Sequence, residues 1–169
     1  MALGRDEILA SFHQALGRFV HAIARLDFDV GMLLIALEEK IGADNSVYLK
    51  PNKSLNDRLL VLKKQIKEAA AGQPSENETK TAAWFVKAGQ LRGLRNDYVH
   101  ARWGIPGTSE TIDPIVKYVP MHWNWDSVEE NIEIQIPVSA LLAQAIEVEN
   151  LADEFYELAK GWPKLTKAT

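Results

Sequence analysis

The chain has 169 residues, 47% of them hydrophobic and 25% charged, which is typical of one globular domain and excludes a disordered chain. It has no cysteine, so disulfides, thiolate metal sites and thiol nucleophiles are excluded. The first residues, MALGRDEILASFHQ, contain no uninterrupted apolar segment, and no stretch approaches the roughly 18 apolar residues of a membrane span. We therefore expect a single cytoplasmic domain over residues 1–169.

The charge is unevenly distributed along the chain. The formal net charge of −4 and the pI near 5.6 disfavour non-specific coating of nucleic acid. Residues 50–67 nevertheless carry six basic side chains and one acid, and residues 87–102 carry four and one. Residues 118–159 have no Lys or Arg against nine acids. Either the basic segments form a local positive site on an acidic body, or both are solvated helix faces.

Apolar residues at steps of three and four predict a first helix over residues 5–41, closed by Gly42. Such a helix is about 55 Å long, which suggests a bend near Gly17 or Gly31, or packing against another subunit. A capping pair, Ser54 and Asp57, precedes LNDRLLVLKKQIKEAA, which predicts a second helix over residues 55–70.

The pair Ser75 and Glu78 predicts the start of a third helix over about residues 76–101, which Gly104 and the following Pro-Gly stop. The segment PIVKYV reads as extended, and NIEIQIPV alternates apolar and polar residues, so we expect a β-hairpin at about residues 114–137. A last helix follows over residues 138–160. The predicted fold is mainly α, a bundle of four to five helices with a small β-hairpin insertion before the last helix.

The chain lacks the residue patterns that most metal and cofactor sites require. His13 and His21 are eight residues apart on one predicted helix, about 12 Å, which is too far to share an ion. Asp97 and His100 form the one carboxylate–histidine pair at i, i+3, short of the paired Glu-x-x-His repeats of a di-iron bundle. No nucleophile elbow, P-loop or dinucleotide fingerprint is present. We expect no metal and no cofactor.

The segment LRNDYVHARWG, at the end of the third predicted helix, carries the most specific chemistry. Asn96 and His100 are at i, i+4 and stack on one helix face, whereas Arg95 reaches that face only with its long side chain. A histidine can exchange a proton with a hydroxyl, and an arginine can hold a phosphate. These are the minimum for metal-free RNA cleavage by the ribose 2′-OH. The alternative is a helix cap at His100 and a surface ion pair at Arg95.

The pattern Arg95-Asn96-x-x-x-His100, late in the penultimate long helix, resembles the Arg-x4-His motif of the HEPN superfamily. The resemblance implies a small helical bundle that forms a homodimer, with the two motifs facing each other. It also implies a metal-independent endoribonuclease of a toxin–antitoxin, phage-defence or RNA-processing kind, with RNA as substrate and an antitoxin-like protein as a further partner. Members that have lost catalysis bind nucleotides, RNA or proteins, so a non-catalytic nucleotide-binding or protein-interaction dimer is the alternative.

The resemblance also assigns roles to single residues. Arg95 binds the phosphate, His100 acts as general base or acid, and Asn96 orients His100 or bonds the substrate. Family members often add a polar residue from the first helix, for which Asp27 is the first candidate and Asp29 the second.

Further contacts are predicted around this motif. Arg92 and Arg102 extend the phosphate contacts. The tryptophans Trp103, Trp123 and Trp125 either stack on bases or, as is commoner for such clusters, fill a core or an oligomer interface.

Overall fold

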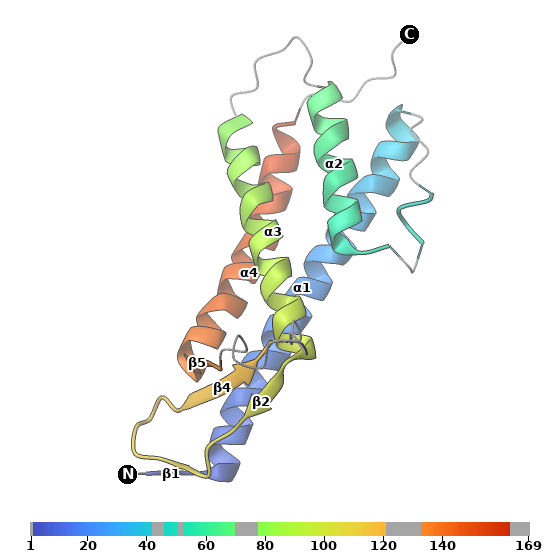
Figure 1. The fold of residues 1–169 in the computed structure, drawn as a ribbon. Helices are drawn as coiled ribbons and strands as arrows, with labels where there is room; N and C mark the ends of the chain where they lie inside the picture. The colour runs from blue at the N-terminus through green and yellow to red at the C-terminus, as the bar shows by residue number, and fades with distance from the viewer. Residues whose placement is uncertain (1, 42–45, 51–52, 70–77, 121–132, 163–169) are drawn as a thin grey trace. The chain divides into compact units, whose positions relative to one another are not determined.

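A computed structural model describes residues 2–41, 46–50, 53–69, 78–120 and 133–162. The helices are α1 (Arg5–Ile41), α2 (Leu55–Ala69), α3 (Glu78–His100) and α4 (Val138–Lys160), as Figure 1 shows. Their bounds agree with the predicted ranges to within two residues, and the mainly helical fold with a strand insertion before the last helix is confirmed. Gly42 and Ser75, the predicted terminator and cap, lie outside the described residues.

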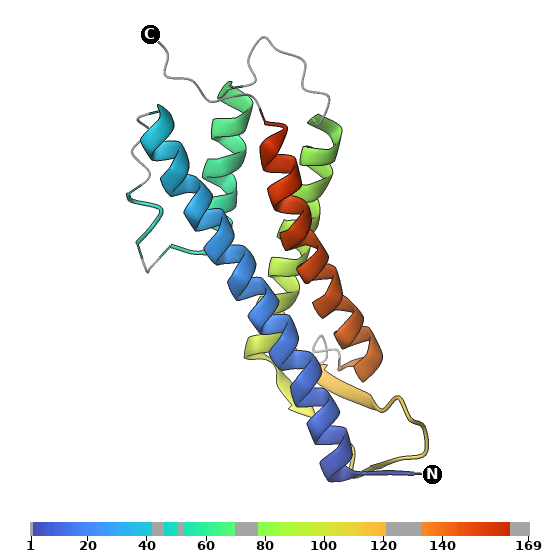
Figure 2. The ribbon, with the colours of Figure 1, turned by 180° about the vertical axis from the view of Figure 1, so that it is seen from behind.

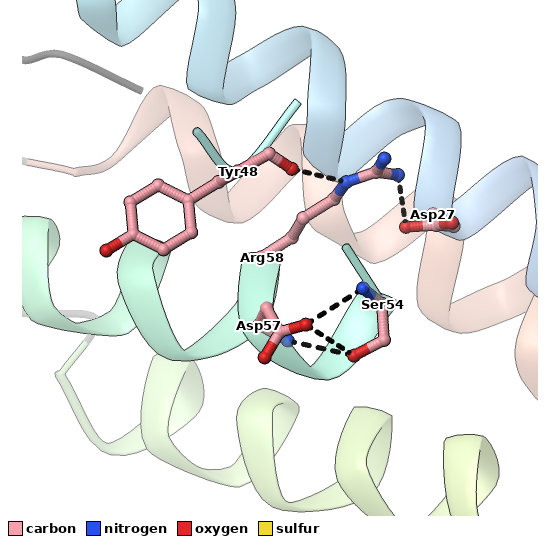
Figure 3. Close-up of polar contacts among 5 residues, drawn as sticks. All are labelled: Asp27, Tyr48, Ser54, Asp57 and Arg58. Carbon is pink, nitrogen blue, oxygen red and sulfur yellow. Dashed lines mark hydrogen bonds and ion pairs between the residues drawn. The ribbon is translucent and has the colours of Figure 1, made fainter. Parts of the chain in front are cut away.

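Side chains close in the sequence cap the starts of α1 and α2. Ser54 and Asp57 form the predicted capping box of α2: the Ser54 amide donates to Asp57 Oδ2 at 2.9 Å, and the Asp57 amide donates to Ser54 Oγ at 3.4 Å (Figure 3). The bond from the Ser54 amide is the main cause that lowers the pKa of Asp57, followed by the bond from the Ser54 hydroxyl. At α1, the Gly4 amide donates to the carboxylate of Glu7 at 2.8 Å, which is half of the same motif.

The predicted hairpin is present, and it belongs to a larger sheet. Strand β4 (Ile115–Val119) pairs antiparallel with β5 (Ile134–Pro137), with Val116 opposite Ile136. On its other side β4 pairs with β2 (Arg102–Gly104), which gives the order β2-β4-β5. Two further strands, β1 (Leu3–Gly4) and β3 (Thr108–Ser109), form a separate pair. β1, β2 and β3 have at most three residues each, too few for alternation to reveal them in the sequence.

Asp113 caps α4 from the segment that precedes β4. Its Oδ1 accepts the Ser139 amide at 2.9 Å and its Oδ2 accepts the Ser139 hydroxyl at 2.5 Å. The Val138 amide donates to the Pro114 carbonyl at 3.0 Å. A carboxylate beside free amides at a helix N-terminus is stabilised by the helix dipole. The start of the hairpin therefore anchors the start of the last helix.

The chain divides into two compact units, each with its own core. The first, which we call the hairpin unit, comprises Met1–Ala22 and Gly93–Val148. It contains β1 to β5, the beginnings of α1 and α4 and the end of α3 (Figure 1). Its core centres on an aromatic cluster whose neighbouring ring centroids are 4.9 to 5.5 Å apart: Phe12, Phe19, Tyr98, Trp103 and Tyr118.

The second, the α2 unit, comprises Ile23–Arg92 and Glu149–Thr169. Within it, α2 lies beside the later part of α1, as both views show (Figures 1 and 2). Trp84 is 3% exposed, packs on Phe155 with ring centroids 5.1 Å apart, and donates from Nε1 to the Leu151 carbonyl at 2.9 Å. The expectation of one domain over residues 1–169 stays a prediction.

Candidate functional site

The last two turns of α3 are oriented by Tyr98, which points into the hairpin unit. Tyr98 is 2% exposed, and its hydroxyl donates to Gln144 Oε1 on α4 at 2.7 Å. Its carbonyl accepts a hydrogen bond from Trp103 Nε1 at 2.9 Å, which satisfies one of the free carbonyls at the helix end. Residues two apart on a helix lie about 200° apart, so an inward Tyr98 directs His100 outward.

The inward position of Tyr98 determines how far Arg95, Asn96 and His100 are exposed to solvent. His100 is exposed at the last position of α3, while Arg95 and Asn96 are half-buried. Arg95 Nη1 donates to Asn96 Oδ1 at 3.1 Å. The guanidinium thus bends toward Asn96, and Asn96 shares a helix face with His100 because four residues make about one turn. Asn96 and the exposed His100 therefore share one helix face, and Arg95 is joined to that face through its bond to Asn96. Together they offer a cation, an amide and an imidazole near the end of α3.

The phenols of Tyr98 and Tyr118, which pack in the aromatic cluster, have raised pKa values. Burial, reinforced by interaction with Tyr118 and only partly offset by the bond to Gln144, raises the pKa of Tyr98 to about 12. Burial likewise raises the pKa of Tyr118, and the negative charge of Asp97 raises it further. Both phenols therefore act as neutral packing and hydrogen-bonding groups near neutral pH.

β2 continues directly from the motif. Arg102 is exposed and lies opposite Val119 of β4, in an edge strand of the sheet. Trp103 packs in the aromatic cluster, with its ring centroid 4.9 Å from those of both Phe12 and Tyr118. Of the two interpretations of Trp103, this packing fits a core residue and not a base-stacking platform. Trp123 and Trp125 lie outside the described residues.

Asp27, which the resemblance assigns to the site, and Arg92, which is predicted to extend its phosphate contacts, both belong to the α2 unit. Asp27 Oδ1 accepts a hydrogen bond from Arg58 Nη1 at 2.7 Å, and Arg58 Nε donates to the Tyr48 carbonyl at 3.1 Å (Figure 3). Arg92 is half-buried, and its Nε has no hydrogen-bond partner among the described residues. The structure thus gives Asp27 a partner on α2, and a role of either residue toward substrate stays a prediction.

Asp29, the second candidate on the first helix, is the more deeply buried of the two acids. It is 6% exposed, and its Oδ1 accepts a hydrogen bond from the Tyr156 hydroxyl at 2.6 Å. Its Oδ2 lies 3.7 Å from Arg25 Nε. The bond to Asp29 is the main cause that raises the pKa of Tyr156. Asp27 and Asp29 both lie between the apolar positions Leu26 and Val30, so the sequence gives no signal that Asp29 is the buried one.

The α2 unit also contains an open groove of about 810 Å³ between α3 and α4. Lys80 and Lys87 line one side, and Asp153, Glu154 and Glu157 line the other. Three carboxylates repel a phosphate, so this groove is a poor nucleotide site. Within the described residues, no three His, Asp or Glu side chains gather closely enough to hold a metal ion, and no helix is long and apolar enough to cross a membrane.

Comparison of the chain with protein-family models, with curated protein sequences and with solved structures finds no match.

Proposed function

We propose that this chain is a HEPN-type, metal-independent endoribonuclease, and that Arg95, Asn96 and His100 form its reactive site. One observation carries the proposal: Arg95 donates to Asn96 at 3.1 Å, and Asn96 shares a helix face with the exposed His100, four residues later. A phosphate-binding cation and a proton-exchanging imidazole therefore share the solvent-exposed end of α3. Tyr98 anchors that end of α3 to α4 through its bond to Gln144, and charges that are already in position contribute most to catalysis.

The proposed reaction is an internal transesterification. His100 removes the proton from a ribose 2′-OH, and the oxygen attacks the adjacent phosphorus while the bond from phosphorus to the 5′-oxygen breaks. The leaving oxygen takes a proton from a second imidazolium, and the products are a 2′,3′-cyclic phosphate and a 5′-hydroxyl. Arg95 stabilises the negative charge that grows on the phosphate oxygens. Asn96 keeps the guanidinium turned toward that charge.

A homodimer suits this chemistry because it supplies two imidazoles. One copy offers a single His100, whereas the reaction needs a base and an acid that act on opposite sides of the phosphorus. Two copies that face each other at the α3 ends would provide both groups. An antitoxin-like protein that covers this end would block the enzyme, in keeping with a toxin or defence role.

The test is cleavage of an end-labelled, mixed-sequence RNA in EDTA by wild type, His100→Ala and His21→Ala. His21 is a matched control because it is also exposed and helical. We expect cleavage with cyclic-phosphate ends by wild type and His21→Ala, and a loss of at least about 100-fold in His100→Ala, the usual contribution of a general base. Undiminished cleavage by folded His100→Ala, or a strict metal requirement, would overturn the proposal.

The alternative is a non-catalytic dimer that binds a nucleotide phosphate or a protein. The hydrogen bond between Arg95 and Asn96 favours this alternative, because it forms without a substrate. If wild type does not cut RNA but Arg95→Ala weakens binding of a labelled mononucleotide, the binding function replaces the catalytic one.

A further inference from the structure

The outer face of α2 carries a compact positive patch. Lys63, Lys64 and Lys67 are exposed there, in the two helical turns that follow Leu60, which is 61% exposed. At 3.6 residues per turn the four side chains fall within about 100° of the helix circumference. We name these four residues the basic face. The opposite face of α2 is buried in the α2 unit through Leu55, Leu59, Leu62 and Ile66.

The positive charge of this face is largely unneutralised. Lys64 lies 3.7 Å from Glu68, and both side chains are more than 60% exposed, so this pair is weak. Among the described residues, no carboxylate forms an ion pair with Lys63 or Lys67. Asp57, the other acid of α2, accepts the hydrogen bonds of Ser54 in the capping box, at the start of the helix. Like charges four residues apart repel, so Lys63 and Lys67 oppose each other until an anion lies over them.

Arg58, also on α2, does not contribute its charge to the basic face. Arg58 is committed to Asp27 and to the Tyr48 carbonyl, as Figure 3 shows. All the positive charge of the basic face therefore comes from lysines, without a guanidinium that could recognise a base or a single phosphate in a fixed geometry. Lysine ammonium groups bind a phosphate backbone as point charges, independently of sequence.

We propose that the basic face binds the phosphate backbone of single-stranded RNA, as an accessory surface separate from the residues of the reactive site. This inference rests on the proposed function, because it is the proposed substrate that supplies the polyanion. Three ammonium groups within two helical turns suit a chain of successive phosphates better than one isolated carboxylate. An anionic membrane suits the face less well, since α2 would have to withdraw Leu55, Leu59, Leu62 and Ile66 from the core to insert.

The test is fluorescence anisotropy with a labelled mixed-sequence single-stranded RNA, in a His100→Ala background that prevents cleavage. The variant is Lys63→Gln/Lys67→Gln. The matched control is Lys80→Gln/Lys160→Gln, which removes two exposed lysines from other helices of the same unit. Each pair takes the formal net charge from −4 to −4 − 2 = −6, so the long-range electrostatics change equally.

We expect the Lys63/Lys67 variant to raise the Kd roughly 10- to 30-fold at about 0.1 M salt, and to lower the slope of log Kd against log salt by about 0.7 per lysine. The control should stay within about threefold of the parent. Equal affinities in variant and control, or no RNA binding by the parent, would overturn the inference. A variant that loses binding to phosphatidylserine vesicles but keeps its RNA affinity would also overturn it, in favour of a membrane.

The two proposals fail separately. Wild type that binds RNA through the basic face but never cleaves it contradicts the endoribonuclease and leaves this inference standing. Wild type that cleaves RNA, combined with an unchanged Kd in Lys63→Gln/Lys67→Gln, contradicts the basic face and leaves the endoribonuclease standing.

Discussion

Arg58 ties α2 to α1 through Asp27, with 2.7 Å between Nη1 and Oδ1 (Figure 3). The Arg58 side chain is 14% exposed and the Asp27 side chain 33% exposed, so water screens this pair less than the Arg25–Asp153 and Lys64–Glu68 pairs. Arg58 also holds the loop before α2 by donating to the Tyr48 carbonyl. One guanidinium therefore joins three segments, and its charge depends on Asp27 for compensation.

We expect Asp27→Asn to lower the free energy of unfolding by roughly 1–2 kcal/mol, because it leaves a largely buried guanidinium without its carboxylate. The control is Asp153→Asn. Its pair with Arg25 is 67% and 44% exposed, so its loss should cost less than about 1 kcal/mol. Urea unfolding of both variants measures the difference. Equal stabilities would mean that the Arg58–Asp27 pair is as weak as a surface pair.

The same variant separates two roles of Asp27. If Asp27 only holds α2, RNA cleavage measured well below the melting temperature should match that of wild type. If Asp27 contacts substrate, as the HEPN resemblance implies, kcat/KM should fall in Asp27→Asn while Asp153→Asn keeps full activity.

A second prediction concerns Tyr156 and the buried Asp29. Tyr156→Phe removes the hydroxyl that donates to Asp29 Oδ1 at 2.6 Å and leaves a carboxylate that is 6% exposed without this donor. An unsatisfied buried acceptor costs about 1–3 kcal/mol, which corresponds to a fall in Tm of several degrees. Tyr48→Phe is the control, because no described residue bonds its hydroxyl. A change in Tm below about 1 °C in Tyr156→Phe would show that Arg25 and water suffice for Asp29.

A third prediction follows from the raised pKa of Tyr98. The unfolded chain releases the phenolic proton near pH 10, whereas the folded chain keeps it to about pH 12. The folded state therefore binds the proton more tightly, and its contribution to stability is full below about pH 10 and is lost as the pH rises toward 12. The slope of the free energy of unfolding over this range should be steeper in wild type than in Tyr98→Phe, by up to about 1.4 kcal/mol per pH unit.

The measurement is urea unfolding at a series of pH values from about 8 to 11. Tyr48→Phe serves as the control for loss of a phenol with no described hydroxyl bond. Identical slopes in wild type and Tyr98→Phe would contradict a phenol held neutral by burial.

The sequence predicts the helices well and the contacts between elements poorly, for a physical reason. The helix bounds follow from local signals, namely apolar spacing and the Ser54–Asp57 capping pair, so they could be placed to within two residues. Asp113 caps α4 from 26 residues away, and no local pattern reveals such a partner. The motif Arg95-Asn96-x-x-x-His100 is visible as spacing, but spacing alone does not show that Arg95 donates to Asn96. Arg58 and Tyr156, which donate hydrogen bonds to Asp27 and Asp29, come from other helices far along the chain, and no local pattern reveals them either.

A fourth prediction tests the capping box of α2. Ser54→Ala removes the hydroxyl that accepts the Asp57 amide and donates to the Asp57 carboxylate, and it should cost about 1 kcal/mol. The control is Ser11→Ala within α1, where the hydroxyl only bonds carbonyls of its own helix and its loss should change stability by less than about 0.5 kcal/mol. Thermal unfolding by circular dichroism compares the two. Equal melting temperatures of Ser54→Ala and Ser11→Ala would show that the cap contributes nothing to stability.

The last prediction concerns the geometry of Arg95. Arg95→Lys keeps the positive charge but loses the planar fork that can bond Asn96 and a phosphate at once. We expect kcat/KM for RNA cleavage to fall about 10- to 100-fold, with little change in Tm because Arg95 is only half-buried. The control is Arg5→Lys, an exposed arginine at the start of α1. If Arg95→Lys cleaves as fast as wild type, charge alone suffices at this position and the Arg95–Asn96 bond has no part in catalysis.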